Sequence, residues 1–599
     1  MTAASPRIAV LIKQVPVAEE LRLSADGRLV REGTARELNP HCRRAVNQAC
    51  MLAGEGRGSV TALTLGPPEA EHCLREAVAW GADRGVLVSD AAFAGSDTFA
   101  TARALHAALK LTGPYDLVLT GRNSIDSDTG QVGPEIAELL GWPFLGAVRE
   151  LVVDAGRLHV VCELDDGVLT ASVRLPAVLA CAERLCAPAK VDAKGRAAVA
   201  RERLRVVRAA DLGPGPWGAA GSLTEVGVAR PTVSSRERIM LQGTVDEQVS
   251  LAVAHLGRRR AFSAEPSETG VVGEDTAHTR LIAVSAEHGR DSLTRELLGE
   301  AARLGGQVVC LDAAGLDDGL LSSWGADTVL DLSAHRQAEE TAAAIADWSS
   351  AAHPWVLLLP GTMWGREVAG RVSVRTASGL TGDAVALEVT RDRLVGWKSA
   401  FSGGLLVAVT ATSDMQMVTV RPGMLPTVAP RTPRQLERTV CSTPRQSRIT
   451  VHDSGRDEGI DALDRARCVI GVGRGVPAEH YGELEPLRQL LRAEVAATRR
   501  VSDLGWLPHS RQVGITGRSI APQLYIAVGV SGKFNHMAGI QRAGTVLAVN
   551  NDPEAPVFAS ADIGIQADWR QVMPLLTEAC AGAGAGRPIT SHGRTTRRC

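Results

Sequence analysis

One pattern of strands and helices occurs twice along this chain, and this internal repeat limits the possible folds more than any other feature of the sequence. In the first copy, a Gly-Ala-Asp motif at 81–83 precedes a β-branched strand, and a later apolar strand ends at Gly121. In the second copy the same motif stands at 325–327, and the later strand ends at Pro360-Gly361. The motif and the strand-end glycine are 40 residues apart in the first copy and 36 in the second. Two related domains are therefore predicted in tandem.

Each copy alternates short apolar strands with amphipathic helices, which is typical of a parallel α/β sheet. The first copy has such strands at 7–16, 60–65 and 116–120, and a third α/β block runs from Cys468 to about Glu578. A length of 599 residues is too great for one hydrophobic core and fits several domains.

The composition excludes several classes of protein. The formal charge of −2 argues against nucleic acid as the main partner, since phosphate binding needs a basic face. The sequence has no apolar run long enough for a membrane span and no export signal. Eleven cysteines without a Cys-x-x-Cys pair argue against an iron–sulfur or zinc site and suit a reducing compartment. A cytoplasmic protein without a bound metal is therefore expected.

The segment 121–133 (GRNSIDSDTGQVG) is the first candidate for a ligand site. It follows a predicted buried strand and precedes a predicted helix at 134–140. In open α/β sheets ligands bind at the carboxyl ends of strands, and a loop of small residues exposes backbone N–H groups to a phosphate. A polar surface loop is the alternative interpretation. The corresponding segment of the second copy, 361–368, lacks the Asp, Ser and Thr residues, so only one copy is expected to bind a ligand.

The third block carries turn residues after each of its predicted strands. Its start, 469–475 (VIGVGRG), is similar to a dinucleotide fingerprint, but Val476 stands where the third glycine belongs, so a tight turn explains it equally well. Polar residues at 498–499 and 514–518 follow later strands. A lone histidine such as His536 is more often structural, but together with a hydroxyl and a cation on neighbouring loops it favours a ligand along one edge of the sheet.

Several long motifs resemble the electron transfer flavoprotein family. Residues 512–540 (QVGITGRSIAPQLYIAVGVSGKFNHMAGI) and 549–568 (VNNDPEAPVFASADIGIQAD) resemble the FAD-binding domain of its alpha subunit. The segments similar to the N-terminal domain of that subunit are 365–383 and 417–425, and those similar to the beta subunit are 8–16, 38–42, 81–90 and 125–143. The chain thus resembles a fusion of a beta subunit with an alpha subunit.

The resemblance implies an α/β fold with two tandem, related Rossmann-like or adenine-nucleotide-hydrolase-like parallel-sheet domains and a C-terminal FAD-binding domain. The expected boundaries are a beta-like adenine-nucleotide-binding domain at 1–200, a beta C-terminal arm and linker at 201–277, an alpha N-terminal-like domain at 278–425, a linker at 426–467, the FAD-binding domain at 468–582 and a disordered tail at 583–599.

The resemblance also implies which residues contact FAD. The matching positions are Arg474, Thr498, Arg499, Val513, Gly514, Ile515, Thr516, Gly529, Ser531, Gly532, Asn535, His536, Asn550 and Asp568. By resemblance, Thr516 is expected to hydrogen-bond flavin N5, His536 to approach the pyrimidine carbonyl and Arg499 to lie beside the isoalloxazine ring. Asn550 and Asp568 are expected to hold the adenosine end. Cations and donors around a reduced flavin stabilise its negative charge and raise its potential.

The beta subunits of this family bind a second adenine nucleotide, which is AMP in some members and a second FAD in electron-bifurcating ones. The matching positions here are Leu11, Asn39, Cys42, Leu65, Gly121, Arg122, Asp126, Asp128, Thr129, Gly130, Gln131 and Val132. The motif Asn-Pro-x-Cys at 39–42 resembles the AMP-binding members, whereas 126–134 resembles the bifurcating or nitrogen-fixation-associated ones. The resemblance therefore leaves AMP and a second FAD open.

By resemblance, the chain is expected to be an electron carrier rather than an enzyme that converts a substrate, with a flavin- or nicotinamide-linked dehydrogenase as donor and a quinone-linked oxidoreductase as acceptor. The alternatives are a two-FAD bifurcating flavoprotein that oxidises NADH, and a nucleotide-binding protein that has lost flavin. The family's partner-docking segment usually reads Asn-Glu-Pro-Arg-Tyr, but here 184–190 is RLCAPAK. A dedicated dehydrogenase, rather than the family's acyl-CoA dehydrogenases, is therefore the expected partner.

Overall fold

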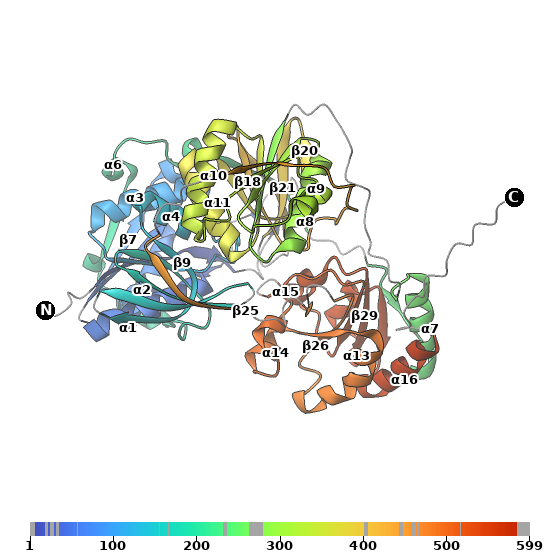
Figure 1. The fold of residues 1–599 in the computed structure, drawn as a ribbon. Coiled ribbons are helices and arrows are strands. Elements are labelled where there is room, and N and C mark those ends of the chain that lie inside the picture. Colours follow the sequence, from blue (N-terminus) through green and yellow to red (C-terminus); the bar gives the residue numbers. More distant parts are fainter. Residues whose placement is uncertain are drawn as a thin grey trace. The chain divides into compact units, whose positions relative to one another are not determined.

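The chain folds into two compact units. The computed structural model describes residues 6–17, 22–23, 29–30, 35–56, 58–154, 156–165, 167–231, 236–262, 280–400, 405–441, 447–456, 462–463, 466–514 and 517–583. Unit 1 comprises Met1–Thr232 and Thr269–Arg456, and unit 2 comprises Val233–Glu268 and Asp457–Cys599 (Figure 1). None of the helices in the described ranges has both the length and the apolar composition that a membrane span requires.

The first sheet of unit 1 has ten strands and is parallel over most of its width. Its order is β13 (Leu204–Val207), β7 (Arg84–Val88), β6 (Ser59–Leu65), β1 (Arg7–Leu11), β8 (Leu117–Gly121), β12 (Ala177–Cys181), β9 (Phe144–Asp154), β10 (Arg157–Glu163), β11 (Gly167–Arg174) and β25 (Ile449–Arg456). All pairs from β13 to β9 are parallel, and those from β9 to β25 are antiparallel.

The second sheet of unit 1 repeats this arrangement. Its order is β14 (Thr224–Pro231), β22 (Leu405–Ala411), β21 (Arg393–Ala400), β20 (Gly379–Thr390), β23 (Gln416–Val420), β19 (Val356–Pro360), β16 (Leu281–Ala286), β17 (Gln307–Asp312), β18 (Thr328–Asp331) and β24 (Glu437–Val440). Here β14 to β20 are antiparallel, and β20 to β24 are parallel. The predicted fold class of tandem related parallel-sheet domains is confirmed.

Side chains alternate between the two faces of each sheet, and each face packs against helices. In β1, Ile8 and Val10 belong to one hydrophobic cluster, whereas Ala9 and Leu11 belong to another. The helices of unit 1 are α1 (Pro40–Gly56), α2 (Glu71–Trp80), α3 (Thr98–Thr112), α4 (Val132–Leu140), α5 (Ala193–Ala197), α6 (Ala209–Leu212), α8 (Asp291–Leu304), α9 (Asp318–Trp324), α10 (Ala338–Ala352) and α11 (Met363–Thr376). Two short ribbons pair β2 (Gln14–Pro16) with β5 (Arg36–Leu38), and β3 (Arg22–Leu23) with β4 (Leu29–Val30).

Each sheet of unit 1 ends on a strand from the other half of the chain. The strand β14, which follows the first sheet in the sequence, pairs with β22 of the second sheet. The strand β25, which follows the second sheet, pairs with β11 of the first, and Figure 1 shows it in orange beside the strands of the N-terminal half. The two halves of unit 1 are therefore joined by backbone hydrogen bonds on both sheets.

Unit 2 contains one six-stranded parallel sheet. Its order is β15 (Ile239–Met240), β30 (Ile563–Gln566), β29 (Thr545–Asn550), β28 (Leu524–Val528), β26 (Cys468–Val472) and β27 (Glu494–Ala497). Its helices are α7 (Val245–Arg258), α13 (Glu485–Leu491), α14 (Arg499–Asp503), α15 (Phe534–Met537) and α16 (Trp569–Gly582). In the sequence, the strand β15 and the helix α7 lie between β14 and β16 of the second sheet of unit 1, yet α7 lies beside α16 (Figure 1).

Candidate functional site

The first candidate site lies at the carboxyl ends of three adjacent parallel strands in unit 1. Leu11, Leu65 and Gly121 are the last residues of β1, β6 and β8. A Cβ atom on Gly121 would lie 2.9 Å from the backbone carbon of His41, so this position must be glycine for α1 to approach the loop. The strand ends, the start of α1 and the loop 121–131 therefore meet at one edge of the sheet.

Asn39 ties the start of α1 to this loop. Its Nδ2 donates to the carbonyl oxygen of Asn123 at 2.8 Å and lies 3.2 Å from the Sγ of Cys42, and its Oδ1 accepts from the N–H of Ile125 at 3.3 Å. Asn39 and Cys42 are both buried, and burial raises the pKa of the Cys42 thiol. Cys42 is therefore a neutral packing group at pH 7 rather than a reactive thiolate.

The two carboxylates of the loop are each paired with a cation. Lys13 Nζ lies 2.8 Å from the carboxylate of Asp126, and although burial opposes the effect, Lys13 lowers the pKa of that carboxyl group. Asp128 has a positive φ of 49° and lies 3.2 Å from the guanidinium of Arg421, which comes from the second half of unit 1. The repulsion that two carboxylates would exert on a phosphate is thus offset by Lys13 and Arg421.

Two polar atoms of the loop remain available for a ligand. Among the described residues, Asn123 Oδ1 and Gln131 Nε2 are buried without a hydrogen-bond partner. Gln131 precedes α4 and makes no side-chain cap, although its Oε1 accepts from Thr98 Oγ1 at 2.9 Å. Buried unpaired polar atoms are costly, so their presence beside an uncapped helix start fits a polar ligand at this loop.

The corresponding helix start in the second half is occupied by protein groups. Thr362 caps α11 by accepting from the N–H of Gly365 at 3.0 Å, and the N–H of Met363 donates to Asp165 at 2.6 Å. Two N–H groups at the start of α11 are therefore already bound, whereas the N-cap side chain of α4 makes no capping hydrogen bond with the described residues.

All of the residues predicted for the first site lie at this one edge. The ends of β1, β6 and β8 contribute Leu11, Leu65 and Gly121, the start of α1 contributes Asn39 and Cys42, and the loop and the start of α4 contribute Arg122, Asp126, Asp128, Thr129, Gly130, Gln131 and Val132. Of these last seven residues, the first five are half-buried loop residues, Gln131 is buried, and Val132 is the half-buried first residue of α4.

The structure adds charged residues that were not predicted from the sequence. Arg366 of α11 pairs with Asp383 of β20 at 2.6 Å, and Arg421 lies 3.7 Å from the same carboxylate. Lys398 of β21 is buried beside this pair, and among the described residues its Nζ has no hydrogen-bond partner; burial lowers its pKa to about 8. Arg366 and Arg421 lie within segments that carry the family resemblance, but no local pattern shows that they face the loop of the first half.

The second candidate site lies at the carboxyl edge of the sheet in unit 2. Arg474 follows β26, Thr498 and Arg499 follow β27, Gly529, Ser531 and Gly532 follow β28, Asn550 ends β29 and Asp568 follows β30. Because these strands are parallel, all of these residues lie along one edge. Asn535 and His536 lie on α15, which follows the loop after β28.

The exposed side chains at this edge are polar or charged. Arg474, Arg499, Ser531, Asn535 and Asp568 are exposed. Thr498 and Asn550 are half-buried, and Val513, Gly514, Gly529, Gly532 and His536 are buried or half-buried. This set of cations, hydroxyls, amides and backbone N–H groups fits an elongated ligand that carries phosphates. Ile515 and Thr516 lie outside the described residues.

Two of these polar side chains already have local roles. Asn550 Nδ2 donates to the carbonyl oxygen of Val530 at 2.9 Å, and its Oδ1 accepts from the N–H of Asp552. Asp568 caps α16 by accepting from the N–H of Arg570 at 2.9 Å. Each of them retains acceptor capacity for a ligand, since a carboxylate and an amide oxygen both accept more than one hydrogen bond.

The glycines at 471–475 allow close packing within unit 2. A Cβ atom on Gly473 would lie 2.1 Å from the carbonyl oxygen of Gly529, and one on Gly475 would lie 3.0 Å from Gly529 backbone atoms. The N–H groups of Gly473 and Gly475 donate to Val528 and Gly529. The interpretation of this motif as a tight turn therefore accounts for these two glycines.

His536 is enclosed by protein atoms. Its Nε2 lies 2.8 Å from the hydroxyl of Tyr525, and its Nδ1 lies 2.9 Å from the carbonyl oxygen of Val513. Burial lowers the pKa of His536 to about 4, so the imidazole is neutral at pH 7.

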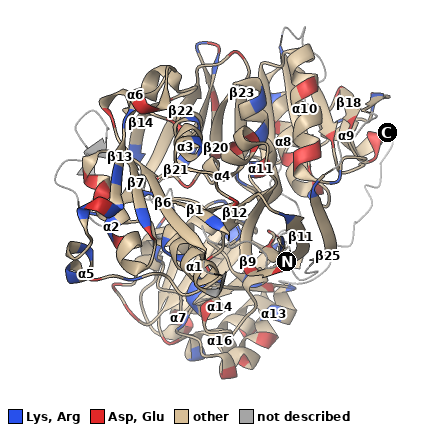
Figure 2. Ribbon diagram, turned by 90° about the vertical axis from the view of Figure 1, so that its left-hand side faces the viewer, with Lys and Arg blue, Asp and Glu red and all other residues tan. Residues whose placement is uncertain are grey.

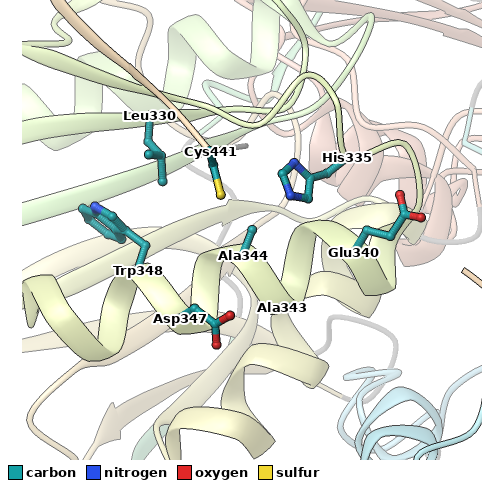
Figure 3. Close-up of a pocket in the computed structure, with 8 residues that line it drawn as sticks. All are labelled: Leu330, His335, Glu340, Ala343, Ala344, Asp347, Trp348 and Cys441. Carbon is teal, nitrogen blue, oxygen red and sulfur yellow. The ribbon is translucent and has the colours of Figure 1, made fainter. Parts of the chain in front are cut away.

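A separate cavity of about 230 Å³ lies against α10 in unit 1. Figure 3 shows His335, Trp348 and Cys441 around it, together with Glu340 and Asp347. None of the residues predicted for either site lines this cavity.

Family models match most of the chain. The electron transfer flavoprotein domain matches residues 26–206 and 282–443, and the electron transfer flavoprotein FAD-binding domain matches residues 462–541.

The two halves of the chain are similar to different subunits. The electron transfer flavoprotein subunit beta of Thermoanaerobacterium thermosaccharolyticum is 37% identical over 259 residues, which are 43% of this chain and 99% of the relative. The subunit alpha of the same organism is 30% identical over 313 residues, which are 47% of this chain and 91% of the relative. The caffeyl-CoA reductase-Etf complex subunit CarD of Acetobacterium woodii is 36% identical over 212 residues, which are 35% of this chain and 81% of the relative.

Proposed function

The chain belongs to the electron transfer flavoprotein family, with a beta-like region followed by an alpha-like region in one polypeptide, and from this we propose that it carries electrons from a dehydrogenase to a quinone-linked oxidoreductase. FAD, when bound, supplies the reversible uptake of electrons. The residues along the carboxyl edge of unit 2 bind and orient it.

One observation carries this proposal. The segments that follow β26, β27, β28, β29 and β30 all begin at the same edge of the sheet. Their exposed residues include Arg474 and Arg499. Two cations at this edge stabilise the negative charge of phosphates and of a reduced flavin. The match of the FAD-binding domain to residues 462–541 covers three of these loops.

Quantifying the flavin and the nucleotides released from the denatured protein tests the proposal. We expect one FAD and one further adenine nucleotide for each chain. A correctly folded, colourless protein from which no flavin is released would overturn the proposal and favour a nucleotide-binding protein that has lost flavin.

The further adenine nucleotide is assigned to the loop 121–131 of unit 1. Three features support this assignment: the start of α4 has no side-chain cap and Gln131 Nε2 has no hydrogen-bond partner among the described residues, and Lys13 pairs with Asp126. Replacing Gln131 with Leu removes a buried donor while keeping a similar volume. This variant is expected to release less of the second nucleotide and an unchanged amount of FAD from unit 2.

The alternative function is electron bifurcation with two FAD molecules. The loop segment 126–134 (DSDTGQVGP) supports it, because that motif resembles the bifurcating or nitrogen-fixation-associated members of the family. Release of two FAD molecules per chain, together with reduction of the bound flavin by NADH, would replace the single-flavin proposal with this one.

The partner surface of the first half is basic. Between Arg184 and Arg208 the chain has eight basic and two acidic side chains, although the whole chain has a formal charge of −2. Those exposed are Arg184, Lys190, Lys194, Arg201, Arg203, Arg205 and Arg208, and of these only Arg184 forms an ion pair with a described acidic residue. Figure 2 shows basic residues in blue on α5 and beside β13. A dehydrogenase with an acidic docking face complements this surface.

The composition of 184–190 supports a dedicated dehydrogenase as the donor. Mixing the protein with an acyl-CoA dehydrogenase and its substrate is expected to reduce the bound flavin slowly. Rapid reduction would show that the altered segment does not exclude these donors.

A further inference from the structure

We propose that Tyr525 is a positioning residue, whose hydroxyl holds the ring of His536 in one orientation and thereby fixes the turn at Val513-Gly514 at the carboxyl edge of unit 2. This inference rests on the proposed function, because it assigns Tyr525 a role in the FAD site of unit 2.

The hydroxyl of Tyr525 reaches His536 across the neighbouring strand. Tyr525 lies on β28 and is fully buried. A Cβ atom on Gly471 of β26 would lie 1.7 Å from the Tyr525 hydroxyl oxygen, which no side chain can tolerate. Because Gly471 has no side chain, the side chain of Tyr525 can extend across this position. This explains why a glycine occurs inside a buried strand, where glycine is otherwise unfavourable.

The partners of His536 determine its tautomer. The carbonyl oxygen of Val513 can only accept a hydrogen bond, so Nδ1 of His536 must carry the proton that it donates there. In the neutral ring Nε2 is then bare and accepts from the hydroxyl of Tyr525. The low pKa of the buried His536, about 4, agrees with this neutral form.

His536 connects two loops at the edge of the sheet. Val513 also donates its N–H to the carbonyl oxygen of Ala497 at 2.9 Å, at the end of β27. A Cβ atom on Gly514 would lie 2.5 Å from the carbonyl oxygen of Asn535, so the turn packs directly on α15. A ring that rotated would release Val513 from α15 and change the position of the turn.

The orientation of His536 can be tested through the protonation state of its two ring nitrogens. In the full-length protein labelled with ¹⁵N-histidine, we expect solid-state NMR to show Nδ1 protonated and Nε2 bare, with the signals assigned by difference against His536→Gln. A protonated Nε2 with a bare Nδ1 would overturn the proposal, whether or not FAD is bound.

The variant Tyr525→Phe removes the hydroxyl and keeps the aromatic ring. We expect the Nε2 signal of His536 to move, the dissociation constant of FAD to rise about tenfold, equivalent to about 1.4 kcal/mol or one hydrogen bond, and the midpoint potential of the flavin to change. His536→Gln is expected to change the potential in the same direction. In the double variant, the loss of the hydroxyl should cause no further change, because its effect passes through His536.

Tyr481→Phe is the matched control. Tyr481 lies in the 3₁₀ helix Ala478–Leu484 of unit 2, and its buried hydroxyl has no hydrogen-bond partner among the described residues. This variant should leave the His536 signals and the flavin potential unchanged. A flavin potential that is unchanged in Tyr525→Phe would overturn the inference, and so would additive effects in the double variant; both results leave the proposed function intact. A protein that binds no FAD would instead overturn the proposed function.

Discussion

At the residue scale, buried carboxyl groups of unit 1 differ in charge because their neighbours differ. Burial raises the pKa of Glu135 to about 8; the carboxylate of Asp97 adds to this rise, and the hydrogen bond with Thr98 opposes it. Asp383 is equally buried, but Arg366 lowers its pKa below the usual value. Glu135 is therefore mostly protonated at pH 7, whereas Asp383 is ionised.

The protonated state of Glu135 predicts a pH dependence of stability. Because its pKa is higher in the folded than in the unfolded protein, the folded state binds the proton more tightly. This contribution is complete below about pH 4.5 and is lost as the pH rises to about 8, at about 1.4 kcal/mol for each unit of the raised pKa. Relative to Glu135→Gln, the wild type should lose free energy of unfolding between pH 5 and pH 8 in urea titrations.

The exposed Glu150 provides the control for this measurement. Glu150→Gln should follow the wild type at every pH. An equal pH dependence in the wild type and in Glu135→Gln would show that Glu135 is ionised in the folded protein.

Arg371 of α11 gives a second prediction at this scale. It is buried and lies 3.1 Å from Glu138 of α4 and 3.0 Å from Glu367. Arg371→Leu removes the buried guanidinium from Glu367 and leaves Glu138 with Arg375 as its cation, so the free energy of unfolding should fall by about 3–5 kcal/mol. Arg75→Leu, which breaks a half-buried pair with Glu71 within α2, should cost less than about 1 kcal/mol. Similar losses in both variants would contradict the central role of Arg371 where α4 meets α11.

At the element scale, several segments are stabilised by packing against parts of the chain that are distant in sequence. The helix α7 begins with a capping box formed by Thr244 and Glu247. Its apolar face, including Val249 and Leu256, belongs to the same hydrophobic cluster as α16. The helix signal is local, but the surface that α7 covers is formed by residues about 300 positions later.

Two leucines on α7 test this packing. Leu256 is fully buried, whereas Leu251 is 46% exposed. Leu256→Ala should destabilise unit 2 by about 2–5 kcal/mol and hasten the loss of FAD on heating, because it leaves a cavity. Leu251→Ala should change stability by less than about 0.5 kcal/mol. Thermal unfolding followed by flavin fluorescence distinguishes them, and equal effects would show that α7 does not stabilise unit 2.

Much of the secondary structure could be predicted because its signals are local. The strands 60–65 and 116–120 are short apolar runs, and they correspond to β6 and β8. The strands β14 and β25 could not be assigned to a sheet in this way, because each pairs with residues from the other half of unit 1. The residues at the two candidate sites were found by their position after strands and by resemblance, and their roles toward ligands stay predictions.

At the scale of the whole molecule, one polypeptide takes the place of two subunits. The exchanged strands β14 and β25 and the helix α7 make contacts that would otherwise have to form between separate chains. A covalent connection keeps these surfaces at a high effective concentration.

These contacts predict that the chain can be divided. Two co-expressed fragments, 1–262 and 280–599, should co-elute in size-exclusion chromatography, because β14 still pairs with β22 and α7 still packs against α16. A shorter first fragment, 1–222, lacks β14, β15 and α7 and should associate more weakly. Separate elution of the first pair would show that the connection itself is required for assembly.

The sequence by itself determined the repeated α/β pattern, the strand-end loops and the similarity to two subunits, because strand alternation, turn residues and long motifs are local. Only the tertiary structure decided that Arg421 pairs with Asp128, 293 positions away, and that Tyr525 reaches His536 through the gap at Gly471. Such contacts depend on which surfaces are buried together. Burial lowers the dielectric and limits each polar atom to the few partners that pack against it, and no run of neighbouring residues records that choice.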